Sequence, residues 1–148
     1  MSSRVSVIIP CYNAEKCISK TINTVIEQEY DNIEIVAVDN ESTDNTYKIL
    51  EDIASKNNNI ILSEAENIYP FCWDEAREKG LEISTGDYIT TLCSDDYYEK
   101  DYIKNCVQIM DKLRNKISLI QSPIRGVDTN GNEINRVGHQ YDDIEHFK

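Results

Sequence analysis

Two adjacent carboxylates, Asp95 and Asp96, follow a short apolar segment and are the residues of this sequence most suited to chemistry. Segment 88–92 is rich in β-branched and aromatic residues, which predicts a buried strand that carries Ser94 and both aspartates beyond its carboxyl end. In an open α/β sheet, ligands bind at that edge. Neighbouring carboxylates repel each other, and a divalent cation with oxygen ligands commonly offsets the repulsion. Two solvated turn aspartates are the alternative, so the pair alone does not establish a metal site.

Further chemistry-bearing residues follow the other predicted strands. Segments 5–9 and 33–38 read as strands, the first stopped by Pro10, because proline cannot donate to a β-ladder. Tyr12 lies in the loop after the first strand, and Asp39 ends the second. An aromatic ring and three carboxylates along one edge suit a flat ligand that donates hydrogen bonds and carries phosphate. The sequence contains neither glycine-rich phosphate-binding motif, so a metal is expected to hold the phosphates.

The elements that must position these residues alternate between strand and helix. Apolar residues recur at helical spacing over 14–29, over 47–54 with Ser42 or Thr43 as the expected cap, over 71–83 and over 101–116. Segments 60–62 and 118–122 read as further strands, and Asn130-Gly131 predicts a hairpin turn. This alternation predicts an α/β, Rossmann-like, mostly parallel sheet flanked by helices, with a C-terminal β-hairpin, in a single domain over 1–148.

Composition narrows the class of protein. The 148 residues carry a net charge of −12 and a pI near 4.5, which argues against nucleic acid as a partner because no phosphate-neutralising patch is available. The five cysteines are odd in number and show no Cys-x-x-Cys spacing, which favours a reducing, cytoplasmic setting. No apolar stretch approaches membrane-spanning length, so any membrane association is expected only through regions outside these residues.

Four segments together resemble the family 2 glycosyltransferases of the GT-A fold. They are Val-Ser-Val-Ile-Ile-Pro-Cys-Tyr-Asn-Ala over 5–14, Val-Asp-Asn-Glu-Ser-Thr-Asp-Asn-Thr over 38–46, Ala-Arg-Glu-Lys-Gly-Leu-Glu-Ile-Ser-Thr-Gly-Asp-Tyr-Ile over 76–89, and Leu-Cys-Ser-Asp-Asp over 92–96. They occur in the order and spacing of the family and cover nearly the whole chain. Any one of them would be weak evidence, whereas the four together are specific.

The resemblance implies a nucleotide-diphosphate sugar as donor, most often a UDP-sugar, and Mn²⁺ or Mg²⁺ as cofactor. Tyr12 matches the position whose ring packs on the base, and Asp39 matches the carboxylate that accepts the imide N–H of the base. Uracil and thymine carry that hydrogen and cytosine does not, so a carboxylate there discriminates. Arg77 matches an arginine near the diphosphate, and Asp95 matches the metal-ligating aspartate. The full set of expected donor-binding residues is Pro10, Tyr12, Asn13, Asp39, Arg77 and Ser94.

The sequence departs from the family pattern at three places. Cys93 replaces the first aspartate of the Asp-x-Asp motif, and a thiol is a softer, poorer partner for Mg²⁺ or Mn²⁺. We therefore expect weakened metal-dependent donor binding, which Cys93→Asp would strengthen. Glu41 replaces a common glycine, which predicts a less tightly turned loop. Glu78 replaces a common asparagine and adds negative charge near the expected phosphates.

No Asp or Glu matches the catalytic base of inverting members, so the catalytic residue and the acceptor stay unknown. The terminal carboxylates and histidines are interpreted as solvated surface residues: Asp142, Asp143, Glu145, His139 and His146. We expect the chain to be the donor-binding part of a glycosyltransferase without the acceptor-binding half, with a homodimer as one way to cover exposed apolar surface. The alternative is a non-catalytic interaction module of the same fold that no longer binds a donor.

Overall fold

The computed structural model describes residues 2–68, 72–114, 116–128 and 132–137, with the side chains of residues 72, 73 and 135–137 left undescribed. The chain divides into two compact units, Met1–Leu113 and Arg114–Lys148. The first unit holds four strands and four helices in alternation, and the second holds two strands. The carboxylates and histidines interpreted as surface residues, all from His139 onward, lie outside the described residues. The predicted turn at Asn130-Gly131 also lies outside them.

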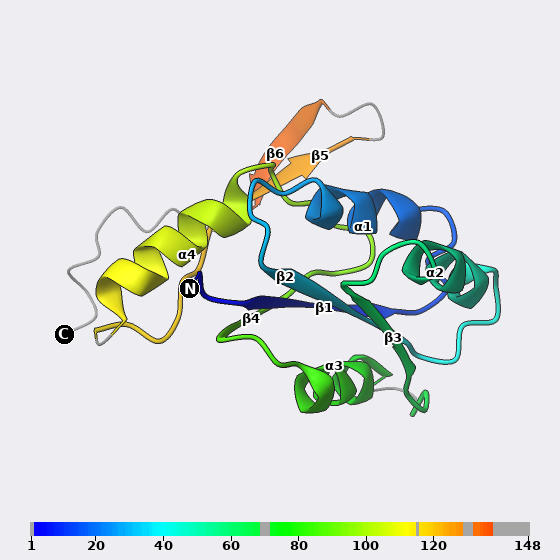
Figure 1. Cartoon of the computed structure of the whole chain (residues 1–148). Helices are drawn as coiled ribbons and strands as arrows, with labels where there is room; N and C mark the ends of the chain where they lie inside the picture. Colours follow the sequence, from blue (N-terminus) through cyan, green and yellow to red (C-terminus); the bar gives the residue numbers. More distant parts are fainter. Residues whose placement is uncertain (1, 69–71, 115, 129–131, 138–148) are drawn as a thin grey trace. The chain divides into compact units, whose positions relative to one another are not determined.

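The first unit is built on a parallel four-stranded sheet in the order β3-β2-β1-β4 (Figure 1). The strands are β1 (Val5–Cys11), β2 (Ile33–Asp39), β3 (Ile60–Glu64) and β4 (Tyr88–Thr91). Every pairing is parallel, and Val5 lies between Ile33 and Tyr88 at the amino ends. The predicted α/β class is therefore confirmed. β4 is half-buried instead of buried, because within the described residues it pairs only with β1.

Pro10 does not stop the first strand, contrary to the expectation from sequence. It is a paired residue of β1, opposite Val38. The carbonyl of Ile8 accepts the N–H of Leu92 on the β4 side, whereas the carbonyl of Cys11 accepts the N–H of Asn40 on the β2 side. Since these directions alternate along a strand, the missing N–H of Pro10 faces the β4 side, beyond the last β1–β4 pair at Thr91. Proline therefore breaks no ladder hydrogen bond there.

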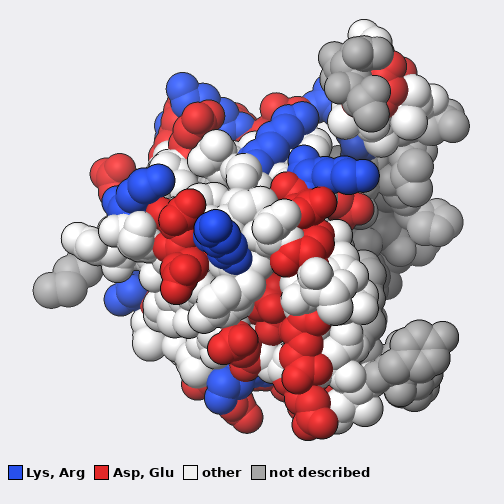
Figure 2. Space-filling view, turned by 90° about the vertical axis from the view of Figure 1, so that its right-hand side faces the viewer, with Lys and Arg blue, Asp and Glu red and all other residues white. Residues whose placement is uncertain are grey.

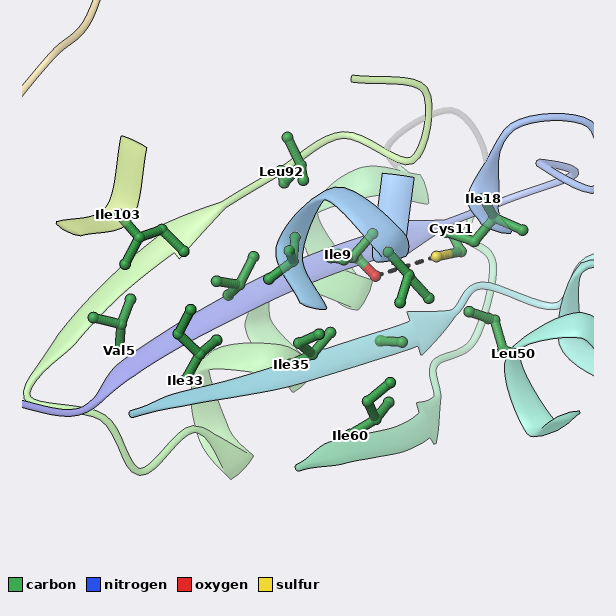
Figure 3. Close-up of a cluster of buried hydrophobic side chains, with 14 of the residues drawn as sticks. Val5, Ile9, Cys11, Ile18, Ile33, Ile35, Leu50, Ile60, Leu92 and Ile103 are labelled. Atoms are coloured by element: carbon green, nitrogen blue, oxygen red, sulfur yellow. Dashed lines mark hydrogen bonds between the residues drawn. The ribbon is translucent and has the colours of Figure 1, made fainter. Parts of the chain in front are cut away.

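Alternate residues of the central strands build two cores, one on each face of the sheet. The larger core takes Val7, Ile9 and Ile35, and it packs against α1 (Ile18–Ile26), α2 (Thr46–Ala54) and α4 (Tyr102–Leu113). Figure 3 shows Ile18, Leu50 and Ile103 approaching this face from the three helices. It also shows the thiol of Cys11 donating to the Ile9 carbonyl at 3.3 Å, so that this buried cysteine is a structural one.

The opposite face is covered by α3 (Cys72–Ile83), which packs on Ile8, Val36 and Val38. Gly80 allows this close approach, because a Cβ at that position would lie 2.4 Å from the Ile8 side chain. The helix therefore sits near enough to the sheet for its first turns to border the carboxyl edge of the strands (Figure 1).

At the amino edge of the sheet, a buried carboxylate ties three segments together. Glu34 of β2 is 1% exposed and accepts hydrogen bonds from the Ser6 hydroxyl and from both the N–H and the hydroxyl of Thr85. Arg4 pairs with the same carboxylate at 2.8 Å. Burial alone would raise the pKa of Glu34, but these hydrogen bonds and the Arg4 charge together lower it. Glu34 is thus satisfied within the fold and is far from free to react.

Several element boundaries differ from the prediction. α1 begins at Ile18 instead of residue 14, because Ala14 to Cys17 form a separate turn closed on the Ala14 carbonyl. α2 begins at Thr46 without a side-chain cap, since Ser42 and Thr43 bond to Asn13 in the neighbouring loop. Segment 118–122 forms no strand.

The second unit contains the predicted hairpin. Strands β5 (Ile124–Val127) and β6 (Glu133–Val137) pair antiparallel, with a register shift between Gly126 and Val127. Asp128 closes the end of the hairpin by accepting the N–H of Asn132 at 2.8 Å. Among the described residues, no helix is both long and apolar enough to cross a membrane.

Candidate functional site

The carboxyl ends of β1 and β2 are joined directly, and this fixes the floor of the candidate site. The N–H of Asn40, one residue after β2, donates to the carbonyl of Cys11, the last residue of β1, at 2.8 Å. Figure 2 views the molecule from this edge and shows carboxylates gathered in a column down its face. An anionic ligand approaching this face therefore meets a negative potential unless a cation accompanies it.

Asp39 holds a buried carboxylate with one oxygen unused. The residue is 2% exposed, and its Oδ2 accepts the N–H of Ser42 at 2.9 Å. Its Oδ1 is buried and has no hydrogen-bond partner among the described residues. Leaving a buried carboxylate oxygen unpaired costs free energy, so such an atom is expected to find a donor when a ligand binds.

Tyr12 lies in the loop that follows β1, at the carboxyl edge of the sheet. The side chain is 45% exposed, and so it can take up a flat ligand without disturbing the core. Asn13 comes next with φ of 48°, a left-handed conformation that asparagine tolerates well. Tyr12 is therefore exposed in the loop at the carboxyl edge, and its packing against a base stays a prediction.

Hydrogen bonds between polar groups join the loop after β1 to the loop after β2. The N–H of Asn13 donates to the Ser42 hydroxyl at 3.0 Å, and the Asn13 Oδ1 accepts the N–H of Thr43 at 2.8 Å. Asp44 accepts the N–H of Glu15 at 3.1 Å, and the Thr46 hydroxyl accepts the N–H of Ala14 at 2.7 Å. The two loops therefore behave as one body that holds Tyr12 and Asp39 together.

The expectation of a loosened turn at Glu41 is wrong. Glu41 adopts φ of 56°, in the left-handed region that favours glycine, and the following N–H still closes on Asp39. Its carboxylate accepts the N–H of Asn67 at 3.2 Å. The tight turn is kept although a bulky side chain occupies it, which costs about 1–2 kcal/mol of local strain.

The segment after β4 brings a thiol and two carboxylates into one cluster. The ligand atoms of Cys93, Asp95 and Asp96 all lie within 4.8 Å of one another. The N–H of Asp96 donates to the Cys93 carbonyl at 3.1 Å, so that a turn folds the two side chains toward each other. Asp96 thus has the turn-forming position expected from sequence and also joins the cluster.

The electrostatics of this cluster reflect its crowding. Burial raises the pKa of the Cys93 thiol, and the charges of Asp96 and Asp95 raise it further. Burial together with the Asp95 charge likewise raises the pKa of Asp96. A cation placed among the three groups would offset both the repulsion and the lost solvation.

Two threonines of α1 hold this segment in place, and the sequence alone did not single them out. The hydroxyl of Thr21, which is fully buried, donates to the Ser94 carbonyl at 2.7 Å. The Thr24 hydroxyl accepts the N–H of Tyr98 at 3.3 Å. A threonine on the otherwise apolar face of a predicted helix was the signal available in the sequence.

Arg77 lies on α3 with its side chain 46% exposed, paired with Asp74 at 3.3 Å. Its charge acts to lower the pKa of the Cys93 thiol, which places the guanidinium within electrostatic reach of the cluster. An exposed pair of this kind is worth little, so Arg77 can exchange Asp74 for a ligand phosphate at small cost. Glu78, the next residue, is exposed on the same helix.

Comparison with known proteins identifies the family. Residues 6–146 match the sequence profile of Glycosyl transferase family 2. The chain belongs to glycosyl transferase family 2. This family 2 chain spans between 14% and 52% of the length of the curated relatives it matches.

The relatives of the family 2 chain include one named enzyme and two solved complexes. It is 38% identical over 107 residues to the UDP-Glc:alpha-D-GlcNAc-diphosphoundecaprenol beta-1,3-glucosyltransferase WfaP of Escherichia coli, covering 72% of this chain and 41% of WfaP. The structure of Staphylococcus aureus TarS 1-349 in complex with UDP-GlcNAc aligns with a TM-score of 0.67 and 26% identity, over 86% of this chain and 41% of that one.

The second solved complex is the mannosyltransferase PcManGT from Pyrobaculum calidifontis with GDP-Man and Mn²⁺. It aligns with a TM-score of 0.66 and 27% identity, over 74% of this chain and 33% of PcManGT. A divalent metal therefore occurs among the structural neighbours. The cluster of Cys93, Asp95 and Asp96 fits such an ion in number and spacing of donors, while its sulfur makes the donor set softer than oxygen alone.

Proposed function

We propose that this chain is the nucleotide-sugar-binding domain of an inverting glycosyltransferase, which uses a metal-bound UDP-sugar to glycosylate a hydroxyl group of its acceptor. The observation that carries the proposal is the unpaired Oδ1 of Asp39, buried at the carboxyl edge of the sheet. The proposal is also supported by the family membership and by a relative named for a UDP-Glc donor.

The base of the donor is assigned to the site formed by Tyr12 and Asp39. The Asp39 Oδ1 accepts the imide N–H of uracil, and this gives the buried oxygen its missing partner. Cytosine presents an acceptor at the same ring position, so it leaves the carboxylate unpaired and adds repulsion between two acceptors. The exposed Tyr12 ring covers one face of the base, as aromatic side chains do for nucleotides elsewhere.

The diphosphate is assigned to the region between Arg77 and the cluster after β4. When bound by Asp95 and its neighbours, a divalent cation supplies Lewis-acid stabilisation of the departing nucleoside diphosphate. Arg77 contributes a positive charge that acts on Cys93, and Ser94 and Asn13 are assigned to the same donor site. The acceptor hydroxyl attacks the anomeric carbon, the bond from that carbon to the diphosphate oxygen breaks, and the hydroxyl proton passes to a base that is assigned to no residue of this chain.

The test is a thermal shift of the full chain with UDP, GDP, CDP and dTDP, each with and without Mn²⁺. A ligand that binds only the folded state stabilises it, by about 2.7 kcal/mol at a hundredfold excess over its dissociation constant. We expect UDP and dTDP to raise the melting temperature only with Mn²⁺, and CDP to have little effect. If no nucleotide changes the melting temperature, the donor-binding proposal is wrong and a non-catalytic module of the same fold becomes the better reading.

A further inference from the structure

The segment that follows β4 contains a donor set that a purely oxygen-binding metal would not use well. Cys93 contributes sulfur, and Asp95 and Asp96 contribute oxygen, all within 4.8 Å of one another. Magnesium prefers an octahedral shell of hard oxygen ligands, whereas thiolate favours zinc, cadmium and cobalt. The chemistry of the ligands therefore bears directly on which ion the cluster accepts.

The thiol of Cys93 is positioned to act as a ligand, because it faces the carboxylates and not the core. Its Sγ lies within 4.8 Å of a carboxylate oxygen of both Asp95 and Asp96, whereas the thiols of Cys11 and Cys17 donate to the backbone carbonyls of Ile9 and Ala14. A metal ion can displace the thiol proton of Cys93 and take the sulfur together with the carboxylate oxygens. This geometry sets Cys93 apart from Cys11 and Cys17.

The cluster is also held ready for an ion by the surrounding fold. The N–H of Leu92 donates to the Ile8 carbonyl at 2.9 Å, which anchors the start of the segment to β1. The buried Thr21 hydroxyl anchors the Ser94 carbonyl at 2.7 Å, between the two ends of the cluster. Because the backbone is anchored at Leu92 and at Ser94, little ordering of the chain is needed when a metal binds.

We propose that Cys93, together with Asp95 and Asp96, makes the metal site of this protein selective for thiophilic divalent ions over Mg²⁺, with Cys93 as the residue that determines the selectivity. This inference rests on the proposed function, since it concerns the ion that accompanies the nucleotide donor. It replaces the simpler expectation that the cysteine only weakens metal binding.

The test uses Cd²⁺ and Mg²⁺ with the full chain, in the absence of nucleotide. We expect stoichiometric Cd²⁺ binding with an ultraviolet absorption band from the metal–thiolate bond, and an affinity for Cd²⁺ about a hundredfold or more above that for Mg²⁺. Cys93→Ser should remove the band, and Cys106→Ser, which takes away a thiol outside the cluster, should retain it. Cys93→Asp should bring the two affinities to within about tenfold by strengthening Mg²⁺ binding.

Asp95→Asn provides a second variant that keeps the thiol. It should retain the absorption band and lower Cd²⁺ affinity about tenfold or more, since one charged ligand is lost. The proposal is overturned if Cys93→Ser keeps the band, or if the unmodified chain binds Mg²⁺ as tightly as Cd²⁺. A thiolate band without any nucleotide-dependent thermal shift would support the metal selectivity while contradicting the proposed donor, so the two failures can be told apart.

Discussion

Ser42 donates its backbone N–H to the Oδ2 of Asp39 at 2.9 Å, and this single bond orients the carboxylate so that its Oδ1 is left buried, with no partner in the part of the chain that the structure describes. The fold thereby engages the Oδ2 of Asp39 in a hydrogen bond and leaves its Oδ1 available to accept one from a ligand. A side chain oriented in this way can read the hydrogen-bond pattern of a base edge, because the reserved atom can only accept.

The first prediction concerns Asp39→Asn. The amide oxygen keeps the bond from Ser42, and the amide nitrogen takes the position of the reserved oxygen, which turns an acceptor into a donor. UDP affinity should fall about tenfold to a hundredfold, the equivalent of one hydrogen bond to a charged group, while CDP affinity should rise. Calorimetric titration with UDP and with CDP in the presence of Mn²⁺ measures how the ratio of the two affinities changes.

Asp52→Asn is the matched control for this experiment, because it makes the same chemical change on the exposed surface of α2. It should leave both affinities unchanged. An Asp39→Asn variant that still prefers UDP over CDP by the original ratio would show that Asp39 does not contact the base.

The second prediction concerns the Tyr12 ring. Tyr12→Ala should weaken binding of all nucleoside diphosphates by about 1–3 kcal/mol, since stacking on an aromatic face does not depend on the identity of the base. Tyr12→Phe keeps the aromatic ring and should bind nucleoside diphosphates with the same affinity as the unsubstituted chain. Because the side chain is 45% exposed, neither change should shift the unfolding free energy by more than about 0.5 kcal/mol. Equal affinities for the alanine and phenylalanine variants would contradict the stacking role.

The third prediction separates phosphate from base recognition at Arg77. Arg77→Ala should lower UDP affinity about tenfold and leave the affinity for uridine unchanged, because the guanidinium is assigned to the diphosphate. Lys79→Ala removes a comparable charge from the same helix, where it pairs with Glu82 at 3.3 Å, and serves as the control. Calorimetric titration with UDP and uridine distinguishes the two variants. A parallel loss of uridine binding in Arg77→Ala would indicate damage to the fold instead.

Much of this arrangement could be predicted from the sequence, since buried parallel strands appear as apolar runs and their carboxyl ends mark the ligand edge. Tyr12, Asp39 and Asp95 were found in this way. The hydrogen bonds of Asn13 with Ser42 and Thr43 could not be predicted, because they join residues about thirty positions apart in the sequence. The side chains involved are also ordinary cap and turn formers. The continuation of β1 through Pro10 depends on where β4 ends, which no local pattern encodes.

The fourth prediction concerns pH and the buried Glu34. Its pKa is lowered in the folded protein, so its contribution to stability is fully present above the ordinary glutamate pKa and is lost as the pH falls through the folded value. Glu34→Gln should therefore lower the unfolding free energy by about 2 kcal/mol at pH 7, and the difference should shrink below about pH 4. Urea unfolding across this pH range provides the measurement, with the exposed Glu51→Gln as control. A difference that is constant with pH would contradict the role of the charged carboxylate.

The last prediction concerns the strained turn after β2. Glu41 holds φ of 56°, and glycine adopts this conformation without the steric cost that Glu41 bears. Glu41→Gly relieves about 1–2 kcal/mol of strain, adds unfolded-state entropy and loses the bond to the Asn67 N–H, so the unfolding free energy should rise by up to about 1 kcal/mol. The same substitution at Glu51, inside α2, should lower it by about 1 kcal/mol. Denaturant unfolding of the two variants should thus give changes of opposite sign, and an equal loss of stability in both would mean that the turn is not strained by its side chain.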